Sequence, residues 1–156
     1  MPRLDRLPEA QRNAMLTQPV AEAESAPCTS LAKPLSACTL AIVTTAGIHH
    51  RDDKPFAGGD HTFRVIGSEA KQGDIIQSHA SIGFDRTATY RDLNIVFPID
   101  RVRELVERGE LGALAPRSYS FMGAQRDTAK ITAETAPEVA QRLKEDGADI
   151  VLITPT

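Results

Sequence analysis

The hydrophobic residues of this chain form short apolar runs that alternate with polar segments. Residues 39–44 (TLAIVT) make a continuous run that is typical of a buried strand. Residues 61–66 alternate between polar and apolar side chains, which predicts a half-exposed strand. Shorter runs at 74–78 and 93–97 predict two more strands, and residues 111–114 predict a short strand or a sheet edge. The chain is therefore expected to build a β-sheet.

The C-terminal residues combine the end of a helix with one more strand. Gly147 supplies the left-handed conformation that ends helices, and the apolar run 150–153 predicts a parallel strand covered on both faces. Ligands of parallel sheets bind just beyond the carboxyl ends of the strands, which is where Thr154 and Thr156 lie in this sequence. An α/β enzyme normally continues from such a point with a loop and a helix. We therefore expect this chain to stop at a ligand-binding edge.

Three segments have the spacing of helices. Residues 98–109 predict an amphipathic helix that Asp100 caps, and residues 135–144 predict a second one that begins with a capping box at Thr135. A short amphipathic helix is expected over residues 8–16. Together with the strands, these helices define the fold class.

The order of these elements favours an α/β fold. A strand, a long polar loop over residues 48–60, further strands, two helices and a final strand predict a single three-layer domain with a mostly parallel sheet flanked by helices. We assign residues 33–156 to this domain and residues 1–32 to a polar N-terminal helix and linker. The length of 156 residues suits one domain that buries a core without disulfides or metals.

Composition and charge exclude several classes of protein. The net charge of −3 and the scarcity of aromatic residues argue against a nucleic-acid or anionic-membrane surface. No apolar run approaches the roughly 20 residues that span a bilayer, and the N-terminus lacks the apolar core of a signal peptide. We expect a cytoplasmic protein. Its only cysteines, Cys28 and Cys38, match neither a redox pair nor a zinc half-site, which indicates ordinary thiols.

Hydroxyl side chains follow several of the predicted strands. Thr44 and Thr45 end the first strand and Thr154 ends the last. The carboxyl ends of parallel strands share one edge, so these residues are expected to bind substrate in a common cleft together with Thr156. Hydroxyl residues also end strands simply as turn formers, and the sequence does not decide between the two interpretations.

The segment 78–86 (SHASIGFDR) carries the densest set of reactive side chains. His79 is expected to act as a general acid or base, or to hold a substrate carboxylate. Arg86 has the planar fork that binds a carboxylate, and Asp85 is expected to orient either group. The segment also supplies two hydroxyl groups that are candidates for substrate binding, those of Ser78 and Ser81. The alternative is a surface loop in which Asp85 and Arg86 pair with their neighbours.

Several histidine and aspartate residues invite a metal interpretation. His49 and His50 are adjacent, so in a strand only one of them can reach a given ion. A site would combine that histidine with Asp60, His61 or His79, a set suited to zinc or iron. No H-x-x-x-H or H-E-x-x-H motif supports it. We assign no metal and keep His49 and His61 as weak candidates for a metal-dependent hydrolase.

Several segments taken in order resemble one known family. The strongest are SHASIGFDR at 78–86, DLNIVFPIDRVREL at 92–105 and GALAPRSYSFMG at 112–123, and residues 44–47 and 58–60 also fit. They resemble the selenoprotein B family of the glycine, sarcosine and betaine reductases, to which D-proline reductase is related. This resemblance covers roughly residues 33–156.

The resemblance implies an oxidoreductase in which a selenol or thiol attacks a small substrate and cleaves a C–N or similar bond. In such proteins a strand like the last one leads into a selenocysteine or cysteine motif. We therefore expect the catalytic residue beyond Thr156, and a chain truncated at a selenocysteine codon, which is also a stop codon, and inactive as given. His79 is then expected to stabilise the selenolate or thiolate. No other cofactor is implied.

The resemblance also implies partners, namely a partner reductase subunit or a thiol donor. The free side of the last strand further predicts a homodimer. The alternative function is a non-catalytic subunit that binds a ligand or assembles a complex through the same cleft.

Overall fold

The computed structural model describes residues 4–17, 29–81 and 84–155. The chain divides into two compact units, residues 1–30 and 31–156. In the first unit a 3-10 turn, η1 (Leu4–Arg6), precedes the helix α1 (Glu9–Leu16), so the predicted N-terminal helix is confirmed. The second unit contains the sheets and the candidate site.

A five-stranded sheet forms the centre of the second unit. Its strands are β1 (Thr39–Thr44), β3 (Phe63–Gly67), β5 (Ala113–Leu114), β6 (Arg117–Phe121) and β7 (Ile150–Thr154). The central strand β1 pairs in parallel with β7 on one side and with β5 and then β6 on the other. Only β3 is antiparallel, and it pairs with β6. The predicted mostly parallel sheet is confirmed.

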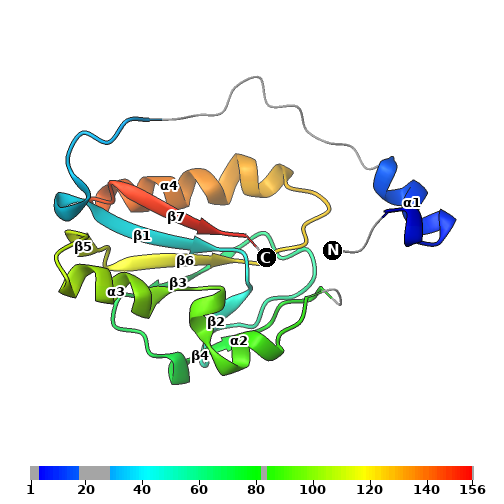
Figure 1. Cartoon of the computed structure of the whole chain (residues 1–156), viewed down its shortest axis with the longest axis horizontal. Helices are drawn as coiled ribbons and strands as arrows, with labels where there is room; N and C mark the ends of the chain where they lie inside the picture. Colours follow the sequence, from blue (N-terminus) through cyan, green and yellow to red (C-terminus); the bar gives the residue numbers. More distant parts are fainter. Residues whose placement is uncertain (1–3, 18–28, 82–83, 156) are drawn as a thin grey trace. The chain divides into compact units, whose positions relative to one another are not determined.

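Two helices cover the opposite faces of this sheet. Figure 1 shows α3 (Ile99–Glu107) on one face and α4 (Ala136–Glu145) on the other, which makes the three layers expected from the sequence. The helix α2 (Thr87–Arg91) and the 3-10 turns η2 (Leu35–Ala37) and η3 (Gln72–Asp74) connect the remaining elements.

The core consists of two apolar clusters, one on each face of the sheet. Alternate residues of a strand point to opposite faces, so Ile42 packs in the cluster with Val102 of α3 while Ala41 packs in the cluster with Val139 of α4. Cys38 is fully buried in the first cluster, where its thiol hydrogen-bonds to the Pro34 carbonyl oxygen at 3.4 Å. This cysteine is therefore a core residue, as expected for an ordinary thiol.

A second sheet corrects two predictions. It pairs β2 (Ile48–His50) antiparallel with β4 (Ile75–Gln77), so the start of the predicted loop is a strand. The strand predicted at 93–97 is wrong, because Leu93–Ile95 form a 3-10 turn, η4, in which the Asp92 carboxylate accepts the backbone N–H of Asn94 at 2.9 Å. A short apolar run can belong to a buried turn or to a buried strand, and its periodicity alone does not distinguish the two.

The predicted helix caps are also wrong. Asp100 lies inside the first turn of α3, where its carboxylate accepts from Asn94 at 3.0 Å and from Arg103 at 2.7 Å. Thr135 does not cap α4, because the π-helical turn η5 (Ile131–Thr135) already precedes that helix. The Thr135 hydroxyl instead donates to the His61 carbonyl oxygen at 2.9 Å. Asp100 thus bonds to neighbours in the sequence and Thr135 to a tertiary partner, and neither acts as the cap that the local pattern predicted.

The last strand is less covered than its sequence predicts. Val151, Leu152 and Ile153 are 39%, 36% and 63% exposed. Within the described residues β7 pairs with β1 alone, so its outer edge has no strand partner. The expectation of a strand covered on both faces is wrong because apolar character shows what a strand can bury, not what lies beside it.

Candidate functional site

A cavity of about 700 Å³ opens where the parallel strands end. Met122 of its wall directly follows β6, and His61 shortly precedes β3 at the same edge of the sheet. The loop after β4 contributes Ala80 and Ser81. The rest of the wall comes from two loops and the start of the π-helical segment, through Gly58, Gly59, Ala124, Gln125, Arg126, Asp127 and Lys130. The carboxyl edge of a parallel sheet is the usual place for a ligand.

The loop after β6 is held in a defined conformation. Ala124 has a left-handed backbone with φ of 53°, which is unusual for a residue other than glycine. The Gln125 side-chain amide then donates to the carbonyl oxygens of Asp60, at 2.9 Å, and Met122, at 3.0 Å. These bonds fix the direction in which the following charged residues leave the sheet.

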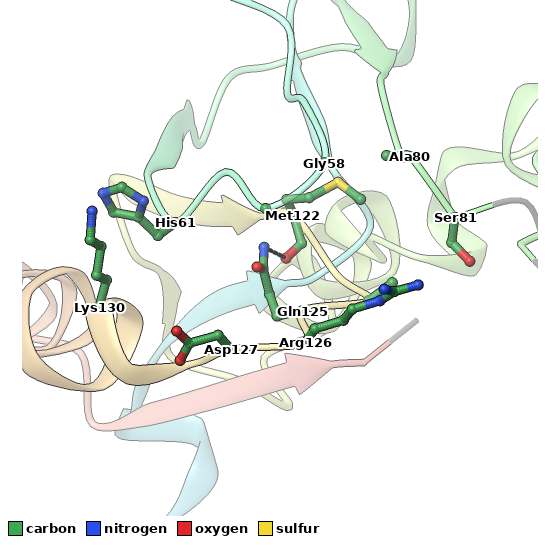
Figure 2. A pocket seen from close by; sticks show the side chains of 11 residues that line it. Gly58, His61, Ala80, Ser81, Met122, Gln125, Arg126, Asp127 and Lys130 are labelled. Carbon is green, nitrogen blue, oxygen red and sulfur yellow. Dashed lines mark hydrogen bonds between the residues drawn. The ribbon is translucent and has the colours of Figure 1, made fainter. Parts of the chain in front are cut away.

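Three charged side chains of this loop face the cavity. Figure 2 shows the Lys130 amine beside the His61 ring at one end, Arg126 extending toward the other end, and the Asp127 carboxylate between them. Arg126 and Lys130 are both exposed, and among the described residues neither has an ion-pair or side-chain hydrogen-bond partner. One oxygen of Asp127 accepts the backbone N–H of Ala129 at 2.9 Å. Sequence reasoning missed this group, although the charged residues of the segment 126–130, which follows a predicted turn at Gly123, were a usable signal.

His79 directly precedes Ala80 and Ser81 in the loop after β4, but it does not itself line the cavity. Its side chain is only 4% exposed and packs on the Phe84 ring, with 4.7 Å between the ring centroids. Nδ1 accepts the backbone N–H of Ser81 at 3.2 Å, so Nε2 carries the proton of the neutral ring. Nε2 has no partner among the described residues. Burial, and then the charge of Arg86, lower the pKa of His79, so the neutral form dominates at pH 7.

Gly47 sets the position of His79. Its φ of 63° is left-handed, and a Cβ at this position would come within 3.2 Å of the His79 Cα. The Gly47 carbonyl oxygen accepts the backbone N–H of Ser78 at 2.9 Å, and its N–H donates to Phe121 at 2.9 Å. Glycine thus allows the loop after β4 to approach the carboxyl edge of the main sheet.

Ser78 is engaged by a buried histidine. His49 is fully buried, and its Nδ1 donates to the His50 carbonyl oxygen at 2.7 Å. Nε2 therefore accepts from the Ser78 hydroxyl, also at 2.7 Å. Both nitrogens of His49 are thus occupied. In the part of the chain that the structure describes, no group of three or more histidine, cysteine, aspartate or glutamate side chains is placed to hold a metal ion.

Two of the threonines at the strand ends lie together, but their hydroxyls bond to a backbone carbonyl oxygen. The hydroxyls of Thr44 and Thr154 both donate to the Val96 carbonyl oxygen, at 3.0 and 2.7 Å. The backbone N–H of Thr45 donates to the Thr154 carbonyl oxygen at 3.2 Å. These bonds tie the ends of β1 and β7 to η4. Thr156, the remaining predicted threonine, lies outside the described residues, as does Cys28.

The remaining candidate residues of the segment 78–86 lie in different surroundings. Ser81 lines the cavity. The Asp85 carboxylate accepts the backbone N–H of Thr87 at 2.8 Å and so begins α2, and this bond lowers its pKa. Arg86 is exposed, and its charge contributes to lowering the pKa of His79. The structure thus brings Ser81 and His79 near the cavity and gives Asp85 a local partner.

The fold and the cavity together define an α/β domain with a cavity at the carboxyl edge of its sheet, where charged and polar side chains form part of the wall. The chain belongs to the glycine/sarcosine/betaine reductase selenoprotein B family, whose model matches residues 6–156. It is 44% identical over 127 residues to D-proline reductase subunit gamma of Acetoanaerobium sticklandii, an alignment that covers 81% of this chain and 52% of that protein.

A second relative belongs to a different reductase of the same family. The betaine reductase complex component B subunit beta of Peptoclostridium acidaminophilum is 33% identical over 130 residues, covering 80% of this chain and 29% of that protein. The chain thus spans about half, or less, of the length of these curated relatives. No solved structure matches it. Among the described helices none has the length and apolar character needed to cross a membrane.

Proposed function

We propose that this chain is the substrate-binding part of a reductase that cleaves a small amino acid at a carbon–nitrogen bond. The observation that carries the proposal is the cavity with charged side chains at the carboxyl edge of the sheet, in a chain of the selenoprotein B family. The relatives are named for reductases of D-proline and betaine, which are small amino acids or their derivatives. A cavity of about 700 Å³ holds such a molecule and leaves room for a reacting group.

The proposed reaction is a two-electron reduction by a selenol or thiol that lies outside these residues. The selenolate or thiolate attacks the carbon bonded to nitrogen, and the C–N bond breaks with its electron pair going to nitrogen, which takes a proton. A thiol then attacks the selenium or sulfur, and the carbon leaves with a second proton. A second thiol completes a disulfide. The electron donor is therefore a dithiol, and D-proline would give the linear five-carbon amino acid.

The end of β7 supports the proposed origin of the attacking group. Thr154 lies at the edge of the sheet where the cavity opens, tied to Thr45 of β1 by the bond described above. A residue that followed β7, or a thiol of a partner subunit, would reach the substrate from this edge. The lowered pKa of His79 favours the neutral ring over an imidazolium, and its Nε2–H, which has no partner among the described residues, would reach a substrate only if the side chain turned out of its buried position.

We also propose that β7 is an association surface and that a second copy of this chain covers it. Its edge lacks a strand partner among the described residues, and Ile153 is 63% exposed. Exposed apolar edge strands pair readily with other chains. The relatives are named as subunits, which also supports assembly with partner proteins.

Substrate binding tests the proposed function most directly. NMR titration of the 15N-labelled chain with D-proline, glycine, sarcosine and betaine is expected to shift the amide signals of cavity residues for at least one of them. Absence of shifts with all four compounds at tens of millimolar would overturn the proposal.

A reaction assay then separates an enzyme from a binding subunit. The chain is incubated anaerobically with D-proline and dithiothreitol, alone and with the partner subunits of the Acetoanaerobium sticklandii enzyme, and the linear product is measured by mass spectrometry. Product that requires this chain supports the reductase. Binding without product in either mixture indicates the alternative, a non-catalytic ligand-binding or complex-forming subunit.

A further inference from the structure

A second cavity, of about 300 Å³, lies at the small sheet that β2 and β4 form. Its wall also includes Thr89 and Tyr90 of α2 and Leu93 of η4. Among the described residues, none lines both this cavity and the one at the carboxyl edge of the main sheet. The second cavity is therefore a separate place in the fold.

The wall of this second cavity is partly apolar and carries little charge. Four aliphatic side chains form its apolar part, those of Ile48, Ile75, Ile76 and Leu93. Arg51 is the one charged residue among the described residues that line it, and the Arg51 guanidinium donates to the Gly73 carbonyl oxygen at 3.3 Å. An apolar surface favours a ligand with an apolar body, and burying a charge without a partner is costly. The wall therefore suits an uncharged molecule.

Two buried polar side chains of the same wall lack a hydrogen-bond partner. Gln77 is 7% exposed and Thr89 is 5% exposed, and both line the cavity. The Gln77 side-chain N–H donates to the Ala46 carbonyl oxygen at 2.8 Å, which fixes the direction of the amide. Its Oε1, and the hydroxyl of Thr89, have no partner among the described residues. Buried polar groups are nearly always paired, so two unpaired ones at one cavity indicate a ligand.

We propose that this second cavity binds an uncharged small molecule that has an apolar body and an N–H or O–H donor. The donor bonds to Oε1 of Gln77, which can only accept. The Thr89 hydroxyl can donate or accept, so it forms a second bond to either kind of group on the ligand. The site is distinct from the one in the proposed function and does not depend on it.

The ligand enters from the solvent side of the cavity. Arg51, Gln72 and Tyr90 line it and are exposed, Tyr90 to 63%. Oε1 of Gln77 and the Thr89 hydroxyl oxygen are shielded from water. The ligand therefore reaches them as the Tyr90 side chain turns aside and as Thr89 rotates about χ1, for which threonine has two rotamers in a helix.

Three aromatic probes of similar size separate the two hydrogen bonds. Phenol donates and accepts, anisole only accepts, and toluene does neither. NMR titrations of the 15N-labelled chain follow the side-chain amide of Gln77 and the backbone amide of Thr89. Phenol is expected to shift both signals and to bind about five-fold more tightly than anisole, the ratio that one hydrogen bond typically gives. Toluene should bind more weakly than anisole.

Substitutions of Thr89 separate binding from stability. Thr89→Val keeps the shape and removes a hydroxyl that has no partner in the described part of the chain, so it should weaken phenol binding about five-fold without lowering the Tm. Thr89→Ser keeps the hydroxyl and should bind phenol as the unaltered chain does. Thr135→Val is the matched control, because Thr135 is also buried, at 8% exposed, but its hydroxyl donates to the His61 carbonyl oxygen at 2.9 Å. This control should lower the Tm and leave phenol binding unchanged.

Several results would overturn the proposed site. One is the absence of any shift of the Gln77 side-chain amide with phenol at tens of millimolar. Equal binding of phenol, anisole and toluene would show that the cavity takes apolar molecules without using its polar groups. Phenol binding that Thr89→Val leaves unchanged would remove the hydroxyl from the site. A bound water that contacts Gln77 and that phenol does not displace would show that water alone satisfies the wall.

Discussion

At the scale of single residues, two glycines explain parts of the motifs that identify the family. Gly47 admits the backbone of His79, as described above. Gly112 lies against η2, where a Cβ would come within 2.8 Å of backbone atoms of Ala37 and Cys38. Its N–H donates to the Leu35 carbonyl oxygen at 3.1 Å. Both positions need glycine because backbone atoms approach closely, and backbone cannot move aside as a flexible side chain does.

Gly112→Ala is expected to destabilise the fold by about 1–3 kcal/mol, the usual cost of forcing an extra carbon into a filled space. Gly73→Ala is the matched control, because no atom lies within 4 Å of its Cβ position and its φ is not left-handed. Urea unfolding of the three proteins measures the difference. Equal stability of Gly112→Ala and Gly73→Ala would show that the packing against η2 is looser than described.

His79 predicts a pH dependence of stability. Its pKa in the fold is lowered from the ordinary value of 6.5, chiefly by burial. Between the two values the unfolded chain binds more protons than the fold, so this contribution is complete above the unfolded pKa and is lost as the pH falls below it. The free energy of unfolding should therefore decrease from pH 7.5 to pH 5.5, and His79→Gln should decrease less. Identical slopes for both proteins would contradict the assignment.

At the scale of elements, one carbonyl oxygen joins the ends of two neighbouring strands. The carbonyl oxygen of Val96 receives the hydroxyls of both Thr44 and Thr154, which joins β1, β7 and η4 at one point. Thr154→Val keeps the shape and removes one donor. We expect it to destabilise the fold by about 0.5–1.5 kcal/mol, the typical net value of one hydrogen bond. Thermal unfolding monitored by circular dichroism checks this, and an unchanged Tm would contradict it.

The edge strand β7 gives a second prediction at this scale. Ile153→Lys places a charge on the edge and is expected to convert the proposed dimer to a monomer without unfolding it. Ile95→Lys is the control, because Ile95 is exposed to a similar extent, 60% against 63%, but lies in η4. Light scattering coupled to size-exclusion chromatography measures the mass of each. A monomeric unaltered chain at tens of micromolar would exclude the proposed dimer.

At the scale of the whole molecule, local patterns predicted most of the elements but not how far each of them is buried. The β1 strand and the α3 helix lie where their apolar spacing placed them, because each buries one set of side chains in a core cluster. The prediction of a strand at 93–97 was wrong because an apolar run of this length can also belong to a buried turn. The apolar run of β7 predicted the strand but not its exposure, which depends on what lies beside it.

The position of the candidate site could be predicted from the sequence, but the side chains that line it could not. The rule that ligands bind at the carboxyl ends of parallel strands pointed, from the order of elements, to the edge at which the cavity opens. It then pointed to the hydroxyls of Thr44 and Thr154, which instead bond to the Val96 backbone. The charges that line the cavity come from Asp127 and Lys130 in a loop that carried no known motif.

The sequence by itself determined the α/β class, the family and the edge of the sheet at which the cavity opens, because each depends on local spacing or on motifs in order. Only the tertiary structure decided which side chains share the cavity. Gly58, Ser81 and Lys130 are far apart in the chain, and they meet because β3, β4 and β6 bring three loops to one edge. Contacts of this kind form through packing across the whole sheet, which no local pattern records.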